Sequence, residues 1–268
     1  MSLPEWNYLH GKPQSHARFK QQPEDFAVIE DLGFEPDGAG EHILVYVRKR
    51  NENTAWVAGL LAKAAGVQRS AVTWGGLKDR HGVTEQWFGI HVPGKDEPDL
   101  SSVESDTIQI VKRSRHSRKL RTGTLKGNYF RILLRDLLSS SELEARLQAI
   151  AEQGVPNYFG EQRFGRNGNN LEAAESMFQG KRIKDRDKRS LFLSAARSYL
   201  FNQSVSERLA AGLAHTLLAG DCLMLAGTHS FFSEPDVSEA LLQRLGEGDL
   251  QLTAPLWGRG RSGAQGEA

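Results

Sequence analysis

The stretch around which the chain is organised reads Gly75-Gly76-Leu77-Lys78-Asp79-Arg80-His81-Gly82-Val83-Thr84-Glu85-Gln86. It follows the apolar run Ala71-Val72-Thr73-Trp74, so the pattern predicts a turn at the end of a β-strand. The paired glycines permit a tight backbone, and turns at strand ends often carry catalytic side chains. Asp79 is a single carboxylate between two cations, and it is therefore the candidate nucleophile.

The same residues also fit a second interpretation, in which Lys78-Asp79-Arg80 is only a solvated charged turn. Judged locally, that structure is the more common one. An aspartate in a polar turn ionises near pH ~4, so Asp79 would be anionic at neutral pH without activation. If Lys78 or Arg80 approaches it, the anion is favoured further. Charge, exposure and a held orientation are what a carboxylate nucleophile needs.

The composition is that of an ordinary soluble globular protein, with 268 residues of which 39% are hydrophobic and 25% charged. A chain of this length can form one large domain or two smaller ones. No apolar run approaches the roughly 20 residues that cross a membrane. The first residues lack the basic and apolar regions of a signal peptide. We therefore expect a cytoplasmic protein without a membrane segment.

Neither metal nor cofactor chemistry is indicated. Cys222 is the single cysteine, which excludes an internal disulfide, and its apolar neighbours favour a buried thiol. The eight histidines are scattered, without the spacing of a zinc site. Two glycine patterns, at residues 160–165 and 258–263, lack the context that a nucleotide-binding loop requires. We expect no metal and no organic cofactor.

Positive charge is concentrated in one segment, although the net charge is only +1. Between Thr107 and Arg135 there is no Asp or Glu. The cations of this segment are Lys112, Arg113, Arg115, Arg118, Lys119, Arg121, Lys126, Arg131 and Arg135. Such a stripe is typical of a surface that binds a phosphate backbone. The alternative is a solubilising segment neutralised by carboxylates elsewhere in the fold, which we favour less because natural surfaces usually mix both signs.

The residue patterns predict an α+β protein. Strands are expected at residues 23–30, 42–49, 71–74, 86–93, 107–111, 126–134 and 220–227. Helices are expected at residues 55–65, 141–153, 171–179, from 190 to beyond 205, and 235–245. Asn53 or Thr54 offers an N-cap to the first helix, and Ser141 with Glu144 resembles a capping box. The short spacings favour antiparallel strand neighbours.

Several segments resemble the TruD family of tRNA pseudouridine synthases. The turn at Asp79 is similar to the family signature, in which a glycine-containing turn leads to Lys-Asp-(Arg/Lys) and then Val-Thr-x-Gln. A second match is Pro156-Asn157-Tyr158-Phe159-Gly160-Glu161-Gln162-Arg163-Phe164-Gly165. Further matches are Glu24-Asp25-Phe26, Lys126-Gly127-Asn128 and Leu193-Ser194-Ala195-Ala196-Arg197. The resemblance covers nearly the whole chain.

The resemblance implies an enzyme that isomerises uridine 13 in the D arm of tRNA to pseudouridine, with Asp79 as nucleophile and no cofactor. Whether Asp79 attacks C1′ of the sugar or C6 of the base stays open. Phe26 is implied to stack on the uridine, although an aromatic in a strand is usually core. Asn128 is implied to bind the base, although it fits an ordinary turn residue. Lys78 and Arg80 are expected beside the substrate.

We also expect tRNA as the partner of the chain. The residues expected to bind its backbone are Arg113, Arg115, Arg118, Lys119, Arg121 and Arg163. For Arg163 two interpretations are equally supported. Its segment mixes aromatics, an amide and a cation, which suits stacking on RNA. The aromatics could equally plug a core, with Arg163 paired to a carboxylate.

The implied architecture is a pseudouridine-synthase catalytic domain over residues 1–153, with a mixed, mainly antiparallel sheet, followed by an inserted α+β domain over 154–268. Family members return from the inserted domain through a C-terminal segment that carries a substrate-contacting phenylalanine. This sequence has no counterpart to that segment before Ala268. The alternatives are therefore a catalytically incomplete tRNA-binding fragment, or a fold completed by another chain. A methyl transferase is disfavoured because no cofactor loop was found. We expect a monomer.

Overall fold

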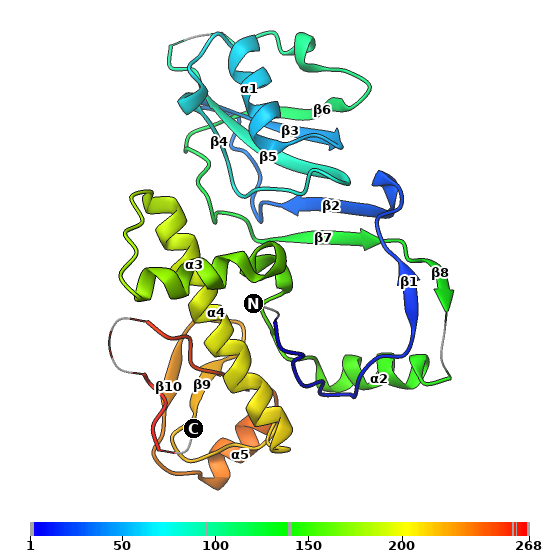
Figure 1. The fold of residues 1–268 in the computed structure, drawn as a ribbon. Helices are drawn as coiled ribbons and strands as arrows, with labels where there is room; N and C mark the ends of the chain where they lie inside the picture. Colours follow the sequence, from blue (N-terminus) through cyan, green and yellow to red (C-terminus); the bar gives the residue numbers. More distant parts are fainter. Residues whose placement is uncertain (1–2, 95, 139–140, 259, 261, 267–268) are drawn as a thin grey trace. The chain divides into compact units, whose positions relative to one another are not determined.

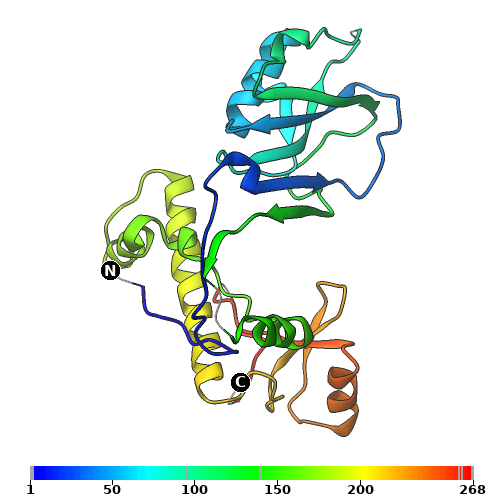
Figure 2. The same cartoon turned by 90° about the vertical axis from the view of Figure 1, so that its right-hand side faces the viewer.

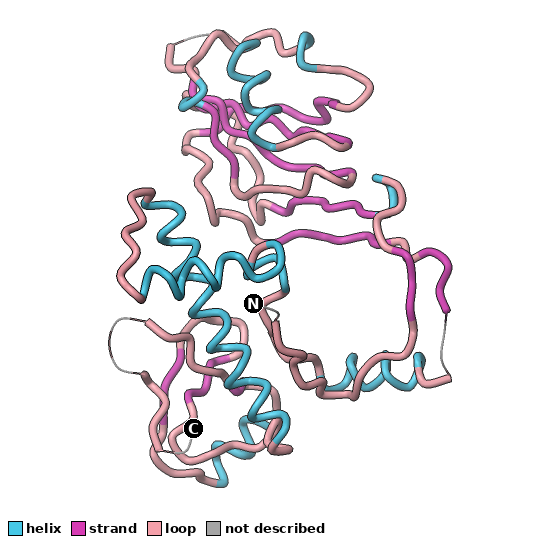
Figure 3. The backbone as a smooth tube through the Cα atoms, in the orientation of Figure 1, coloured by secondary structure: helices cyan, strands magenta, loops and turns pink. Residues whose placement is uncertain are grey.

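The computed structural model describes residues 3–94, 96–138, 141–258, 260 and 262–266. They divide into two compact units, which we call the sheet unit, Gln14–Ser140, and the helical unit, Met1–Pro13 with Ser141–Ala268. Figure 3 shows strands predominating in the first and helices in the second. This division falls before the domain boundary expected after residue 153, because the intervening helix belongs by its contacts to the helical unit. The family domain assignment itself stays a prediction.

The sheet unit is built on a six-stranded sheet in the order β6-β3-β5-β2-β7, with β4 also paired to β5 (Figure 1). Its strands are β2 (Phe26–Asp31), β3 (His42–Arg50), β4 (Val72–Trp74), β5 (Val83–His91), β6 (Ile108–His116) and β7 (Gly127–Ile132). The pairing of β2 with β5 is parallel, and the other pairings are antiparallel. A separate antiparallel pair joins β1 (His16–Arg18) to β8 (Arg135–Leu138). The expected mixed, mainly antiparallel sheet is confirmed.

Helix α1 (Thr54–Ala64) covers one face of this sheet (Figure 2). It begins where the sequence predicted, because the Asn53 side chain accepts a hydrogen bond from the Ala55 amide at 2.8 Å. The buried face is formed by Val57 and Leu61 with their neighbours. Trp56 is 59% exposed, because it lies one position away from the buried residue Val57.

The alternation of side chains along β3 gives the sheet two buried faces. Ile43 and Val45 point to the α1 side, whereas Leu44 and Tyr46 pack on the opposite side with Leu120. The segment that carries Leu120 therefore covers the second face. Because both faces are buried, β3 reads as a continuous apolar run in the sequence.

The helical unit holds α2 (Leu143–Gln153), α3 (Asn169–Phe178), α4 (Arg186–Ala210) and α5 (Glu239–Gly246). Its three-stranded antiparallel sheet has the order β10-β9-β11, with β9 (Cys222–Leu225), β10 (Phe231–Ser233) and β11 (Leu250–Leu252). Short 3₁₀ helices occur in both units at Pro23–Asp25, Arg69–Ala71, Ser101–Val103, Glu161–Phe164 and Arg166–Gly168. None of the described helices is both long and apolar enough to cross a bilayer.

Several helix starts differ from the sequence expectation; α5, for example, begins at Glu239 rather than at residue 235, because Ser238 is its N-cap residue. Helix α4 begins at Arg186 rather than Ser190, because the Asp185 carboxylate accepts hydrogen bonds from the amides of Asp187 and Lys188. The last part of the basic run at residues 181–189 is therefore helical. The capping box expected at residues 141–144 does not form, since Glu142 is the N-cap residue of α2 and makes no side-chain capping bond.

Candidate active site

Asp79 lies on the turn between β4 and β5, and its side chain is 48% exposed. Buried polar side chains from two elements hold the residues just before it. The side-chain amide of Gln86 donates through Nε2 to Gly76 O at 3.3 Å. The main-chain amide of Lys78 donates to Thr54 Oγ1 at 3.2 Å. Thr54 in turn donates to Gln86 Oε1 at 2.8 Å. The turn is therefore tied to α1 and β5, unlike a freely solvated loop.

Gly75 permits a close approach at the start of the turn. A Cβ atom there would lie 2.6 Å from Cδ2 of Leu125, so a larger residue would have to displace the Leu125 side chain. Gly75 O also accepts a hydrogen bond from the Gly123 amide at 2.9 Å. The glycine expected to allow tight backbone thus also leaves room for the side chain of a distant segment.

A buried ion pair lies directly beneath the turn. Lys78 Nζ contacts Glu30 Oε2, and both side chains are buried. Glu30 Oε1 accepts a further hydrogen bond from the Trp87 amide at 3.0 Å. Burial raises the pKa of Glu30, and the Lys78 contact opposes that shift. Lys78 is therefore placed to hold the turn, and this pairing gives no support to the substrate contact expected for it.

Lys20 was missed by the sequence reasoning. Its Nζ lies 3.4 Å from Asp79 Oδ2 and 3.6 Å from the centroid of the Phe26 ring. The backbone of Lys20 adopts φ +55°, which is uncommon for a residue other than glycine. Nothing in the spacing indicates this role, because Lys20 precedes Asp79 by 59 positions. Lys20 therefore contacts both Asp79, the candidate nucleophile, and Phe26, the aromatic residue implied to stack on the uridine.

Phe26 and Asn128 lie on neighbouring strands. Phe26 opens β2, is 6% exposed and packs edge-on against Phe19. Asn128 on β7 is exposed and stands opposite Glu30. Residues opposite one another in an antiparallel pair share a face of the sheet, so Asn128, Glu30 and Phe26 are on the same face. Arg80 is exposed, and its Nε donates to Asn51 O at 3.3 Å.

Comparison with known proteins shows to which family the chain belongs. The family model described as "tRNA pseudouridine synthase D (TruD)" matches residues 5–184 and 181–268. The chain belongs to the TruD family. It is 68% identical to tRNA pseudouridine synthase D of Aeromonas salmonicida over 266 residues, which are 99% of this chain and 76% of the relative.

Other members of the TruD family are similar over the same range. The tRNA pseudouridine synthase D of Pectobacterium atrosepticum is 53% identical, with 97% of this chain and 76% of the relative covered. A crystal structure of a putative tRNA pseudouridine synthase D from Methanosarcina mazei matches with a TM-score of 0.67 and 20% identity. That match covers 94% of this chain and 75% of the other, and it shows the shared fold.

Part of the basic stripe of this TruD-family chain is an exposed surface. The expected strand at 107–111 extends to His116 as β6, so it carries Arg113 and Arg115. Arg113 Nε lies 3.7 Å from Glu97 Oε2, and Arg115 Nη1 donates to Gly40 O at 3.0 Å. Three exposed cations lie in the segment directly after the strand, Arg118, Lys119 and Arg121, and we call this segment the basic loop.

Arg135 does not belong to that surface. Its guanidinium makes two hydrogen bonds to the buried Asp25 carboxylate, at 2.9 and 2.8 Å. It thereby holds the pKa of Asp25 below its usual range. Arg135 is therefore neutralised by a carboxylate elsewhere in the fold, which is the alternative given above for the basic stripe.

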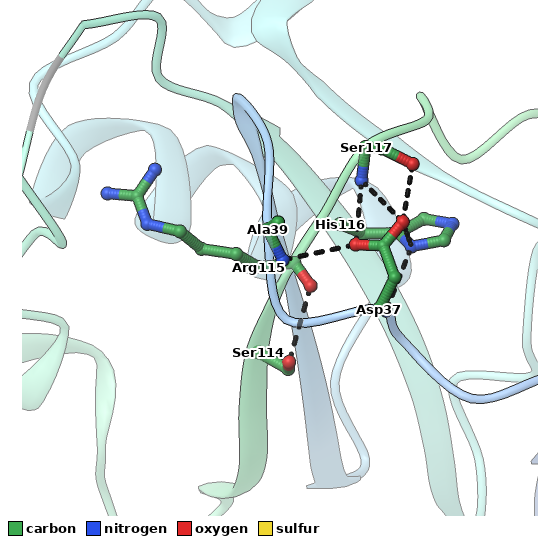
Figure 4. A network of polar contacts seen from close by, with 6 residues as sticks. All are labelled: Asp37, Ala39, Ser114, Arg115, His116 and Ser117. Carbon is green, nitrogen blue, oxygen red and sulfur yellow. Dashed lines mark hydrogen bonds and ion pairs between the residues drawn. The ribbon is translucent and has the colours of Figure 1, made fainter.

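A polar network anchors the loop between β2 and β3 to the end of β6 (Figure 4). Asp37 accepts hydrogen bonds from the amides of Ser117 and Ala39, and from the Ser117 hydroxyl. His116 Nδ1 lies 3.2 Å from the same carboxylate. The Ser117 hydrogen bond is the main cause that lowers the pKa of Asp37 to about 2. Figure 4 shows the Arg115 side chain extending away from this network.

Arg163 lies in the helical unit and is exposed. Its guanidinium carbon is 5.4 Å from the centroid of the Phe159 ring, and its Nη1 donates to Ser194 Oγ at 3.3 Å. Within the described ranges it has no carboxylate partner. Phe164 of the same segment is fully buried, as the core interpretation expected. In the part of the chain that is described, no three potential metal ligands cluster.

Proposed function

We propose that the chain is a tRNA pseudouridine synthase that isomerises uridine 13 of the D arm, with Asp79 as nucleophile. The observation that carries the proposal is a half-exposed carboxylate on a braced turn, with a lysine and an aromatic ring beside it, in a member of the TruD family. Cytoplasmic location and a monomeric state remain predictions.

The proposed reaction needs no cofactor. The bond between N1 of the base and C1′ of the sugar breaks, the base turns, and a bond from C5 to C1′ forms, while the C5 proton is lost and N1 gains one. Asp79 serves as a transient nucleophile at C1′ or at C6. The uridine must leave its stack, which costs about a few kcal/mol and is offset by contacts in the pocket. Phe26 would stack on the base and Asn128 would hydrogen-bond it.

Lys20 has two parts in this proposal. It orients the Asp79 carboxylate, and its ammonium group lies against the ring of Phe26. We expect Lys20→Met to lower the single-turnover rate about 100-fold because the carboxylate loses its partner. Affinity for tRNA should change by less than about threefold, since one charge is a small part of backbone binding. The exposed Lys63→Met is the matched control, and equal rates for both variants would contradict this role.

The basic loop should contribute phosphate contacts. Changing Arg118, Lys119 and Arg121 together to Gln is expected to reduce the slope of log affinity for tRNA against log salt by about 2–3. The control is the same change at Lys181, Arg182 and Lys184, which removes equal charge from another segment. An equal reduction from both triples, measured by filter binding across a salt series, would show that only net charge matters.

The proposed function is tested by mass spectrometry of nuclease fragments from an unmodified tRNA transcript incubated with the chain. A second transcript carries cytidine at position 13. Pseudouridine at position 13 of the first transcript, and none in the second, is the expected result. Pseudouridine elsewhere would overturn the position. Salt-sensitive tRNA binding without product would favour the alternative, a tRNA-binding chain without catalysis.

A further inference from the structure

Lys49 is an unusual residue for the interior of a sheet. It lies near the end of β3, and it is 1% exposed. Lysines are almost never fully buried unless they are paired with an opposite charge. No ion pair of Lys49 is present in the described part of the chain. Its burial therefore calls for another explanation.

The ammonium group of Lys49 is bound by main-chain carbonyls. Nζ donates to Glu52 O at 2.8 Å and to Asp79 O at 3.3 Å. Glu52 lies in the short connection between β3 and α1, so the side chain links that connection to the turn of the candidate nucleophile. Burial lowers the pKa of Lys49 to about 8, and the neighbouring Lys78 charge adds to this effect. The group is thus held at an electrostatic cost, which is typical of functional sites.

Lys49 completes the bracing of the turn at a different point from the other side chains. Gln86 holds Gly76 O and Thr54 holds the Lys78 amide, both upstream of the nucleophile. Lys49 contacts the main chain of Asp79 itself. A rotation of that peptide group would move the carboxylate away from Lys20 and from the ring of Phe26. A small misplacement of a reacting group is enough to lower a rate strongly.

We propose that Lys49 is a positioning residue for the reaction, which holds the Asp79 carbonyl so that the carboxylate faces the uridine. This role rests on the proposed function of Asp79. Lys49 does not contact the substrate, and it acts through the main chain of the turn.

The test compares Lys49→Met with the exposed Lys63→Met in the full 268-residue chain. Methionine fills a similar volume without a donor. We expect the single-turnover rate to fall about 100-fold for Lys49→Met, while the dissociation constant for tRNA changes by less than about twofold. The melting temperature should change little, because the released cost of the buried charge offsets two carbonyls left without a donor.

Hydrogen exchange gives a readout that does not need activity. The amides of Lys78 and Asn51 are bonded to Thr54 Oγ1 and Gly82 O, at the two sides of the turn. Their exchange should accelerate in Lys49→Met while the amides within β3 and β5 stay protected. If the wild-type chain forms no pseudouridine, the proposed function fails, and exchange at these amides still decides whether Lys49 holds the turn.

Three results would each overturn the role proposed for Lys49. A folded Lys49→Met with a rate within about threefold of wild type, or with unchanged exchange in the turn, overturns the proposal. If Lys49→Met does not fold, Lys49→Gln is measured in the same way, since its amide restores a shorter donor. Loss of folding in both variants also overturns the proposal, because Lys49 would then be a core residue rather than a residue of the turn.

Discussion

Asp79→Asn is expected to abolish pseudouridine formation, with a loss in rate of about 10⁴-fold or more, as found when a nucleophile is removed from an enzyme. The amide is nearly the same size as the carboxylate, but it carries no charge and is a poor nucleophile. Binding should persist, because the basic loop and the turn backbone are unchanged. We expect the dissociation constant for tRNA to stay within about twofold of wild type.

The measurement is single-turnover pseudouridine formation beside tRNA binding. The control is Asp106→Asn, which removes an exposed carboxylate elsewhere in the sheet unit. Asp79 is half-exposed, and among the described residues it has one long ion pair, to Lys20, so its replacement should hardly change the melting temperature. A rate within about tenfold of wild type for Asp79→Asn would rule out its role as nucleophile.

Lys78→Met is expected to destabilise the sheet unit by about 3–5 kcal/mol, the usual cost of removing one partner of a buried ion pair. Glu30 would remain as an uncompensated charge in the interior, where, among the described residues, the Trp87 amide alone would donate to it. Urea denaturation followed by circular dichroism measures the loss. The control is Arg50→Met, which breaks an exposed pair with Glu24 and should have a much smaller effect.

The pH dependence of this loss has a definite sign. Burial raises the pKa of Glu30, so the folded state holds a proton over a pH range in which the unfolded state has lost it. Stability from this group is then present at low pH and falls as pH rises through the folded-state pKa. The effect of Lys78→Met should therefore shrink as the pH is lowered and Glu30 takes up a proton.

A double variant distinguishes charge from packing. Lys78→Met combined with Glu30→Leu removes both charges, and it should recover most of the stability that Lys78→Met loses. If the double variant is as unstable as Lys78→Met, the loss comes from packing of the lysine stem instead. In that case the electrostatic explanation is wrong.

Elements of regular pattern were predictable from the sequence. Helix α1 starts at its Asn53 cap and is followed by Gly66 at φ +62°, because capping depends on residues a few positions apart. The strands β3 and β5 follow their apolar runs for the same local reason. The start of α4 was predicted too late because the N-cap residue was not recognised. The Asp185 carboxylate caps this helix, which begins at Arg186.

The partners of the charged residues were not predictable. Arg135 was counted with the basic stripe, yet it binds Asp25, 110 positions away. Lys78 was expected at the substrate, yet it pairs with the buried Glu30. Lys20 and Lys49 were not singled out, although both contact Asp79. No periodicity reports such pairs, because they depend on which strands become neighbours in the sheet.

The sequence by itself determined the α+β class, the family and the candidate nucleophile, since these follow from residue patterns confined to short segments. The tertiary structure decided which groups hold that nucleophile. Residues from β2, β3, α1 and β5 meet at one turn only after the sheet has formed. The strength of a charge or hydrogen bond depends on distance and burial, and both are set by the packing of segments that are far apart in the chain.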